Sequence, residues 1–225
     1  APSSSSPAGV YMECSKKEMD EKNWIPFTTS QQATHFVYSI SPHVILTGRP
    51  ADGTCIKTYT STSFQPLEIL AEKIGASKIR GSATALKFGL NRYLGLIHTK
   101  TKIGRGYTTM AYMFSDVPPY EIVAISRPLP LSGSGLAFPS GLTVLNQEKK
   151  ILITFGVADA QSRIMVLSRE SLRDLFIWRG CRAYDSEWWM KSFPNDLLPS
   201  LSVSTNGFTP ACQKAATDES NNYKN

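Results

Sequence analysis

Three stretches of the chain alternate apolar and polar side chains with the period of two that predicts β-strands. Equivalent positions in them, His35, Tyr93 and Ile151, are separated by 58 residues in both intervals. The stretches are THFVYSIS at residues 34–41, RYLGLIHT at 92–99 and KILITFGV at 150–157. Equal spacing of strand-like segments indicates an internal repeat.

Each of these stretches lies among further predicted strands. WIPF, GSATALKFG and FPSGLTVLN precede them, HVILTG, YTTMAYMF and SRIMVLS follow, and TCIKTYT and YEIVAIS add a fourth strand to the first two units. Turn residues between the runs favour antiparallel hairpins. Sheets of about four strands that recur every 40 to 60 residues or so are typical of β-propeller blades. We therefore expect an all-β fold with about three four-stranded antiparallel blades; a β-sandwich with coincidental spacing is the alternative.

Helical patterns are confined to two short segments. Residues 66–75 have helical spacing and a closing glycine, and residues 168–180 begin with serine and place Leu172, Leu175 and Phe176 on one face. We expect residues 18–178 to form a partial propeller domain. Residues 1–17 are expected to be a disordered leader or a truncation edge, and residues 179–225 an irregular, largely disordered tail.

Composition narrows the range of partners. The chain has 225 residues, of which 41% are hydrophobic and 19% charged, and it has no apolar run near the roughly 20 residues that cross a bilayer. Its net charge of +6 permits anionic ligands. The basic residues form no long block and no nucleic-acid signature is present, so we expect neither a nucleic-acid partner nor a membrane partner.

The four cysteines are widely separated and form no C-x-x-C pair, which argues against a zinc ribbon or a redox motif. They are Cys14, Cys55, Cys181 and Cys212. We expect free thiols, a reducing cytoplasmic compartment, and no metal or cofactor.

Positive charge gathers in HTKTKIGRGY, residues 98–107, where a predicted strand ends and the next begins. His98, Lys100, Lys102 and Arg105 lie within ten residues. One interpretation is a solvated hairpin loop. The other is a pocket for an anion such as phosphate, since cationic side chains form strong hydrogen bonds to phosphate oxygens.

A series of short motifs resembles a known family. DEKNWIPF is followed by HFVYSISPHVIL, then by GSATAL and RYLGLIH, and then by FPSGLTV and ILITFGVADAQSRIMVLSRESL. In this order they resemble the C-terminal portion of the inverting β-mannoside phosphorylases and related β-mannosyltransferases, which are five-bladed β-propellers. The resemblance implies transfer of a β-linked sugar, mannose in that family, to phosphate or to a sugar acceptor with inversion.

The resemblance also implies a phosphate site. Lys22 in EKNW and His98 at the end of YLGLIH match phosphate-side positions. Arg105 would join them as a bidentate partner of phosphate. By itself, Lys22 would be a solvated surface lysine and His98 a hydrogen-bonded structural histidine.

Three further residues are implied to contact the sugar. Asp159 in FGVAD matches a carboxylate that hydrogen-bonds sugar hydroxyls, Tyr107 in GRGY a substrate-facing aromatic residue, and Arg163 in DAQSR a residue of the transferase-like relatives. Asp159 has a simpler interpretation as a turn aspartate. Trp24 and Phe27 are expected in the core between blades.

The chain departs from the family in one respect that bears on activity. Five blades of this kind need more than 225 residues, and the family's catalytic aspartate belongs to blades with no counterpart here. We therefore assign no catalytic residue and expect this chain alone to lack the catalytic acid. Another chain, or further N-terminal blades, would complete the propeller, because an open arc exposes sheet edges and an apolar flank. A non-catalytic scaffold that binds glycan or protein is the alternative function.

Overall fold

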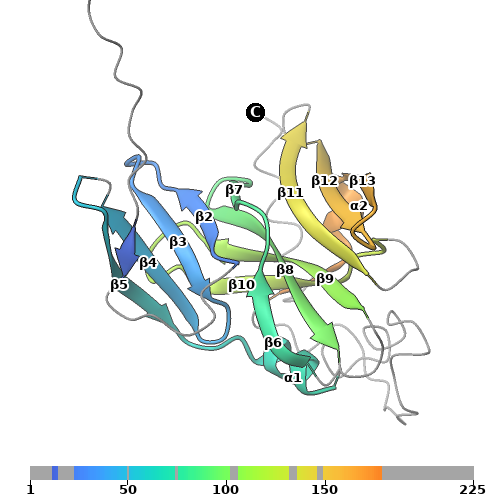
Figure 1. Ribbon diagram of the computed structural model, residues 1–225, viewed down its shortest axis with the longest axis horizontal. Helices are drawn as coiled ribbons and strands as arrows, with labels where there is room; N and C mark the ends of the chain where they lie inside the picture. The colour runs from blue at the N-terminus through green and yellow to red at the C-terminus, as the bar shows by residue number, and fades with distance from the viewer. Residues whose placement is uncertain are drawn as a thin grey trace, which may run out of the picture.

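The computed structural model describes residues 12–14, 23–49, 51–73, 76–101, 106–131, 136–145 and 149–178. These residues form three β-sheets and two short helices (Figure 1). The all-β class predicted from the alternating pattern is confirmed.

The first sheet is an antiparallel meander in chain order. It contains β2 (Ile25–Thr28), β3 (Thr34–Ser39), β4 (His43–Arg49) and β5 (Thr54–Ser61). A two-residue strand, β1 (Glu13–Cys14), lies parallel to the outer strand β5. This short strand belongs to the segment that we expected to be a leader.

The second sheet repeats the meander and gains two strands. Its main strands are β6 (Ala76–Gly81), β8 (Arg92–Thr101), β9 (Tyr107–Ser115) and β10 (Ile122–Pro128). The short strand β7 (Leu86–Lys87) also pairs with β8, and β14 (Phe176–Trp178) pairs with β10. The chain therefore returns from the third sheet to the outer edge of the second.

The third sheet has three strands among the described residues, β11 (Ala137–Leu145), β12 (Lys150–Val157) and β13 (Gln161–Ser168). The strands β3, β8 and β12, which carry the repeat predicted from the sequence, each occupy the second position of their sheet, beside β2, β6 and β11. The three repeated segments thus lie in three separate sheets, of which the third has three strands among the described residues where about four were expected.

The first expected helix is present, and the second is shorter than expected. Helix α1 spans Gln65–Lys73, and α2 spans Arg169–Arg173. Ser168 caps α2, and its Oγ accepts a hydrogen bond of 3.0 Å from the Ser171 backbone N–H. The expected continuation of this helix to residue 180 is wrong, because Phe176–Trp178 form β14 and satisfy their backbone groups on β10.

The second sheet lies between the other two (Figure 1). Along β8, Tyr93 and Ile97 join the core shared with the first sheet, whereas Leu94 and Leu96 join the core shared with the third. Successive residues of a strand point to opposite faces, so one strand supplies both cores.

Phe27 lies in the core between the first and second sheets, with its ring 4.9 Å from that of Tyr93 and 5.2 Å from that of Phe114. Its predicted place is confirmed. Trp24 packs instead on the opposite face of the first sheet, beside Phe36 and Tyr38, so the expectation for Trp24 is wrong. The strand alternation explains the difference, because Trp24 and Phe27 are an odd number of residues apart.

The described sheets do not close into a ring, and the outer face of the third sheet is apolar. On β13, Ile164 is 63% exposed and Val166 is 53% exposed. Leu145 on β11 is also exposed. An exposed apolar flank was expected for an incomplete arc of blades.

Cys14 and Cys55 form a disulfide, which corrects the expectation of free thiols for this pair. They are register partners on β1 and β5, and their Cα atoms are 4.7 Å apart. At a sequence separation of 41, the pairing was not visible from the cysteine spacing, because it depends on the pairing of β1 with β5. Cys181 and Cys212 lie outside the described residues. Within the described ranges, neither helix is long and apolar enough to cross a membrane.

Candidate anion-binding site

Strand pairing gathers polar and charged side chains at one end of the second sheet. His98 on β8 is opposite Arg80 on β6 and Thr109 on β9. Two residues farther along β8, Lys100 is opposite Tyr107. Paired residues share a face, so these side chains project from the face that packs against the third sheet.

His98 is the buried centre of this group. Its side chain is 3% exposed, and its Nδ1 is 2.8 Å from the Ser82 hydroxyl. Its ring meets the ring of Tyr107 edge-on at 5.6 Å and that of Phe138, from β11, at 4.7 Å. Tyr107 and Phe138 are themselves 5.6 Å apart, so three rings fill the space between the second and third sheets.

Burial and a neighbouring cation keep His98 neutral. Desolvation, followed by the charge of Arg80, lowers the pKa of His98 to about 4, although a hydrogen bond with the Gly81 backbone acts in the opposite direction. The imidazole is therefore uncharged at pH 7. The positive charge of this end of the sheet comes from other residues.

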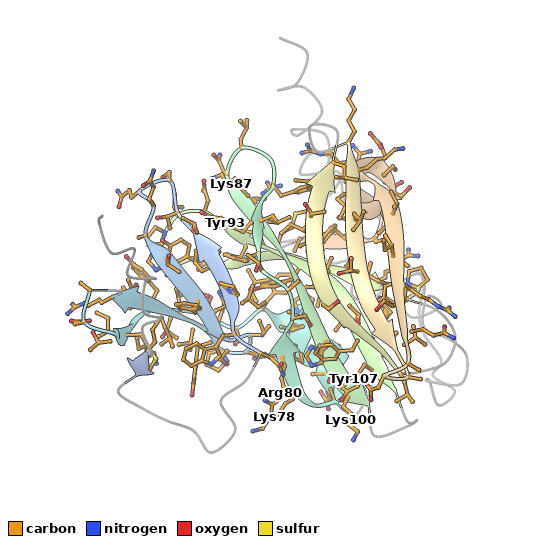
Figure 2. The ribbon with its side chains drawn as sticks, turned by 45° about the horizontal axis from the view of Figure 1, so that its top comes forward. Lys78, Arg80, Lys87, Tyr93, Lys100 and Tyr107 are labelled. Carbon is orange, nitrogen blue, oxygen red and sulfur yellow. A yellow bond between two sulfur atoms is a disulfide. The ribbon has the colours of Figure 1, made fainter. Side chains whose placement is uncertain are left out.

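Among the described residues, three cations supply that charge, and we call Lys78, Arg80 and Lys100 the cationic end. Figure 2 shows all three, together with Tyr107, toward the same end of the second sheet. Lys78 and Lys100 are exposed and Arg80 is half-buried. The Thr99 hydroxyl donates to the Lys78 carbonyl at 2.9 Å, which fixes the backbone at this point.

Arg80 and Lys78 were not identified from the sequence. They lie in SKIRG, a segment with no motif of its own, and about twenty positions before His98. Their role depends on the pairing of β6 with β8, and a register is not visible in the spacing of either strand.

Asp159 lies at the corresponding end of the third sheet. It occupies the β12–β13 turn with a φ of 54°, and the adjacent Ala158 N–H donates to the Leu136 carbonyl at 3.1 Å. Leu136 directly precedes β11, on which Phe138 lies. The exposed carboxylate is thus placed at the end of the third sheet that carries Phe138.

Arg163 lies on β13, the outer strand of the third sheet, and its Nη2 donates to the Gln161 side-chain oxygen at 2.8 Å. The strand β12 separates β13 from β11, where Phe138 lies. Of the sequence-predicted residues, His98 and Tyr107 are therefore brought into contact, Asp159 is at the same end as Phe138, and Arg163 is on the far strand.

Lys22 and Arg105 lie outside the described residues. The residue after Lys22, Asn23, is described, and it lies against the face of the second sheet opposite to His98, because a Cβ added to Gly81 would point toward Ile25 in the core shared with the first sheet. A Cβ atom added to Gly81 would lie 2.5 Å from the Asn23 carbonyl oxygen. The chain at Asn23 is therefore in contact with the residue between Arg80 and Ser82.

The arrangement suits a ligand in which an anionic group is attached to an apolar or hydroxyl-rich group. Guanidinium and ammonium groups donate to phosphate oxygens, and the half-exposed Tyr107 ring offers a flat surface beside them. Within the described ranges, no group of three or more His, Cys, Asp or Glu side chains is placed to hold a metal ion.

No protein-family model matches this chain, and no curated protein matches it significantly. Its function is therefore inferred from the arrangement of its residues and from the sequence resemblance described above.

Proposed function

We propose that this chain binds the phosphate group of a sugar phosphate at the cationic end, with the sugar against Tyr107. The observation that carries the proposal is the pairing of Arg80 with His98 and of Lys100 with Tyr107 on one face of the second sheet. Two cations and an aromatic ring thereby converge from three strands.

The physical chemistry of each group supports this assignment. The Arg80 guanidinium offers two parallel donors to phosphate, and Lys100 adds a second charge. His98 is neutral and buried beneath Tyr107, so it positions that ring rather than contributing charge. Asp159 is a candidate acceptor for sugar hydroxyl groups.

In the wider function that we propose, the protein is a carbohydrate-active propeller that acts on a β-linked sugar, with mannose as the first candidate. Inverting transfer needs a general acid and a nucleophile on opposite faces of the sugar. The cationic end would hold the phosphate nucleophile or the phosphate of the donor. We assign no residue of this chain as the acid, and the chain alone is proposed to bind without turnover.

The proposal is tested by titrating the full chain with mannose 1-phosphate, inorganic phosphate and mannose in a calorimeter. Mannose 1-phosphate is expected to bind most tightly, and phosphate should compete with it. Arg80→Gln and Lys100→Gln should each weaken binding about tenfold, as expected for loss of a charge-assisted hydrogen bond. Lys150→Gln, at the opposite end of the third sheet, is the matched control and should bind normally. Equal affinities in all four proteins would refute the site.

A second candidate function, a scaffold that binds another protein, has its own observation. The outer face of the third sheet carries Leu145, Leu152, Ile164 and Val166, with Leu152 and Val166 in register. The second sheet buries both of its faces against neighbouring sheets. We propose that a further β-sheet, from another chain or from another part of the same protein, covers this face as the next blade.

This second proposal predicts that the outer face of the third sheet associates with other apolar surfaces when no further sheet covers it. The chain should bind a hydrophobic dye and self-associate, and the double variant Ile164→Lys/Val166→Lys should do neither while keeping its circular dichroism spectrum. Ile56→Lys, at another exposed apolar position, is the control. Unchanged dye binding in the double variant would contradict the proposal.

A further inference from the structure

Three polar side chains are buried together between the first and second sheets. His43 begins β4, Ser61 ends β5, and the two are direct register partners. Tyr112 projects from β9 of the second sheet, and its ring meets the His43 ring edge-on at 6.0 Å. His43 and Tyr112 are 0% exposed, and Ser61 is 4% exposed.

The protonation state of His43 follows from its hydrogen bond to the Tyr120 backbone. Its Nδ1 is 2.8 Å from the Tyr120 carbonyl oxygen, and a carbonyl only accepts, so Nδ1 carries the proton. Burial lowers the pKa of His43 to about 4, which leaves the ring neutral at pH 7. The other nitrogen, Nε2, is therefore a bare acceptor, and it has no hydrogen-bond partner among the described residues.

The two hydroxyl groups have the complementary character. Neither Ser61 Oγ nor Tyr112 Oη has a hydrogen-bond partner in the part of the chain that the structure describes. Burial raises the pKa of the Tyr112 phenol well above its ordinary value, so the phenol keeps its proton and remains a donor. The buried group thus consists of one acceptor nitrogen and two hydroxyl groups, each of which can donate and also accept.

We propose that His43, Ser61 and Tyr112 together bind one internal water molecule. Such a water accepts hydrogen bonds from the Ser61 and Tyr112 hydroxyls and donates one to His43 Nε2. Three hydrogen bonds to otherwise unpaired buried groups are typical of an internal water. In the described part of the chain neither hydroxyl is hydrogen-bonded to His43 Nε2, so without a water all three buried groups would stay unpaired, which buried polar groups rarely tolerate.

Gly95 holds the Tyr112 ring in the position that this site requires. Gly95 is the register partner of Tyr112, and a Cβ atom added there would lie 2.6 Å from Tyr112 Cε1. The ring therefore lies directly over the glycine. Since His43 and Ser61 belong to the first sheet and Tyr112 to the second, the water bridges the two sheets.

The test uses the full chain and two conservative variants, Tyr112→Phe and Ser61→Ala. In the wild-type protein, NMR magnetisation transfer should connect a long-lived water with the His43 and Tyr112 ring protons. Each variant should lower the folding equilibrium constant about tenfold, shift the His43 Nε2 resonance, and lose the water signal. The double variant should cost less than the sum of the two, because both changes remove the same water.

Tyr93→Phe is the matched control, since the Tyr93 hydroxyl donates directly to the Thr28 carbonyl at 2.8 Å. It should lower stability without changing the His43 Nε2 resonance. A Tyr112→Phe protein as stable as the wild type, with no water signal in either, would overturn the proposal. So would an Nε2 resonance that moves in Ser61→Ala but not in Tyr112→Phe, which would indicate a direct bond between His43 and Ser61.

Discussion

Arg80 and His98 lie directly opposite each other on β6 and β8, and the cation helps to keep the buried imidazole neutral. Positive charge and side-chain packing are therefore supplied by two different residues, whereas a protonated histidine would supply both. Arg80 contributes charge at the half-exposed side of the cluster, whereas His98 contributes shape and a hydrogen bond to Ser82.

This relationship predicts how stability depends on pH. The pKa values of His98 and His43 are each lowered from 6.5 to about 4 in the folded protein. The unfolded chain therefore binds protons first as the pH falls, so this part of the stability is present above pH 6.5 or so and is lost toward pH 4. We expect a loss of about 2–3 kcal/mol per histidine, measured by urea unfolding across that range.

His98→Asn provides the corresponding control, because asparagine does not titrate and still offers a hydrogen bond to Ser82. Its unfolding free energy should fall less steeply between pH 6.5 and 4 or so than that of the wild type. Parallel pH profiles for the two proteins would show that His98 ionises normally in the folded state.

Arg80→Lys distinguishes the geometry of the cationic end from its charge. Lysine keeps the charge but loses the planar pair of donors, so the affinity for mannose 1-phosphate should fall about three- to tenfold. Arg80→Gln should lose more, and its affinity should depend less steeply on salt. Equal affinities for the Arg80→Lys and wild-type proteins would mean that Arg80 acts as a point charge only.

Replacing Gly81 or Gly95 by alanine should lower the unfolding free energy by different amounts. In Gly81→Ala the new Cβ would lie 2.5 Å from the Asn23 carbonyl oxygen and 2.3 Å from Ile25 Cγ1, whereas in Gly95→Ala it would meet the Tyr112 ring at 2.6 Å. A ring can tilt more readily than a backbone can shift. We expect a loss of about 3 kcal/mol for Gly81→Ala and about 1–2 kcal/mol for Gly95→Ala, measured by urea unfolding. The reverse order would indicate that the backbone at Asn23 yields.

Because Cys14 and Cys55 form a disulfide, the unfolding free energy of the protein should depend on whether reductant is present. Opening the bond between Cys14 and Cys55 releases a loop of 41 residues and should lower the unfolding free energy by about 2–4 kcal/mol. Unfolding with and without reductant measures this effect, and Cys14→Ser/Cys55→Ser should match the reduced protein and be insensitive to reductant. Thiol labelling of native Cys55 without reductant would contradict the pairing. The bond itself favours an oxidising compartment over the reducing one expected from the cysteine spacing.

The sheets were predictable because their signal is local. Alternation in RYLGLIHT and KILITFGV reports which side chains enter a core, and the equal spacing of His35, Tyr93 and Ile151 reports the repeat. All three stretches became the second strand of a sheet. Pro66 and the closing glycine of its segment were sufficient to place α1.

The remaining features depend on contacts between distant segments. Arg80 belongs to the candidate site because it pairs with His98 across the sheet. Cys14 lies beside Cys55 because β1 pairs in parallel with β5. Phe176 has the spacing of a helical residue, but it lies in a strand because its segment pairs with the edge of β10. Periodicity describes which way a side chain points along its own strand and contains no information about its neighbour across the sheet.

The return of β14 to β10 has a mechanical consequence. The polypeptide leaves the second sheet after Pro128, builds the third, and comes back to pair Trp178 with Ala124. A force that pulls the third sheet away must first shear the three-residue ladder between β14 and β10, so the return strand acts as a latch. Under tension the second and third sheets should yield as one unit, whereas the first sheet, which is held to the second by a shared core and by bonds such as that from Tyr93 to Thr28, has no such return strand among the described residues.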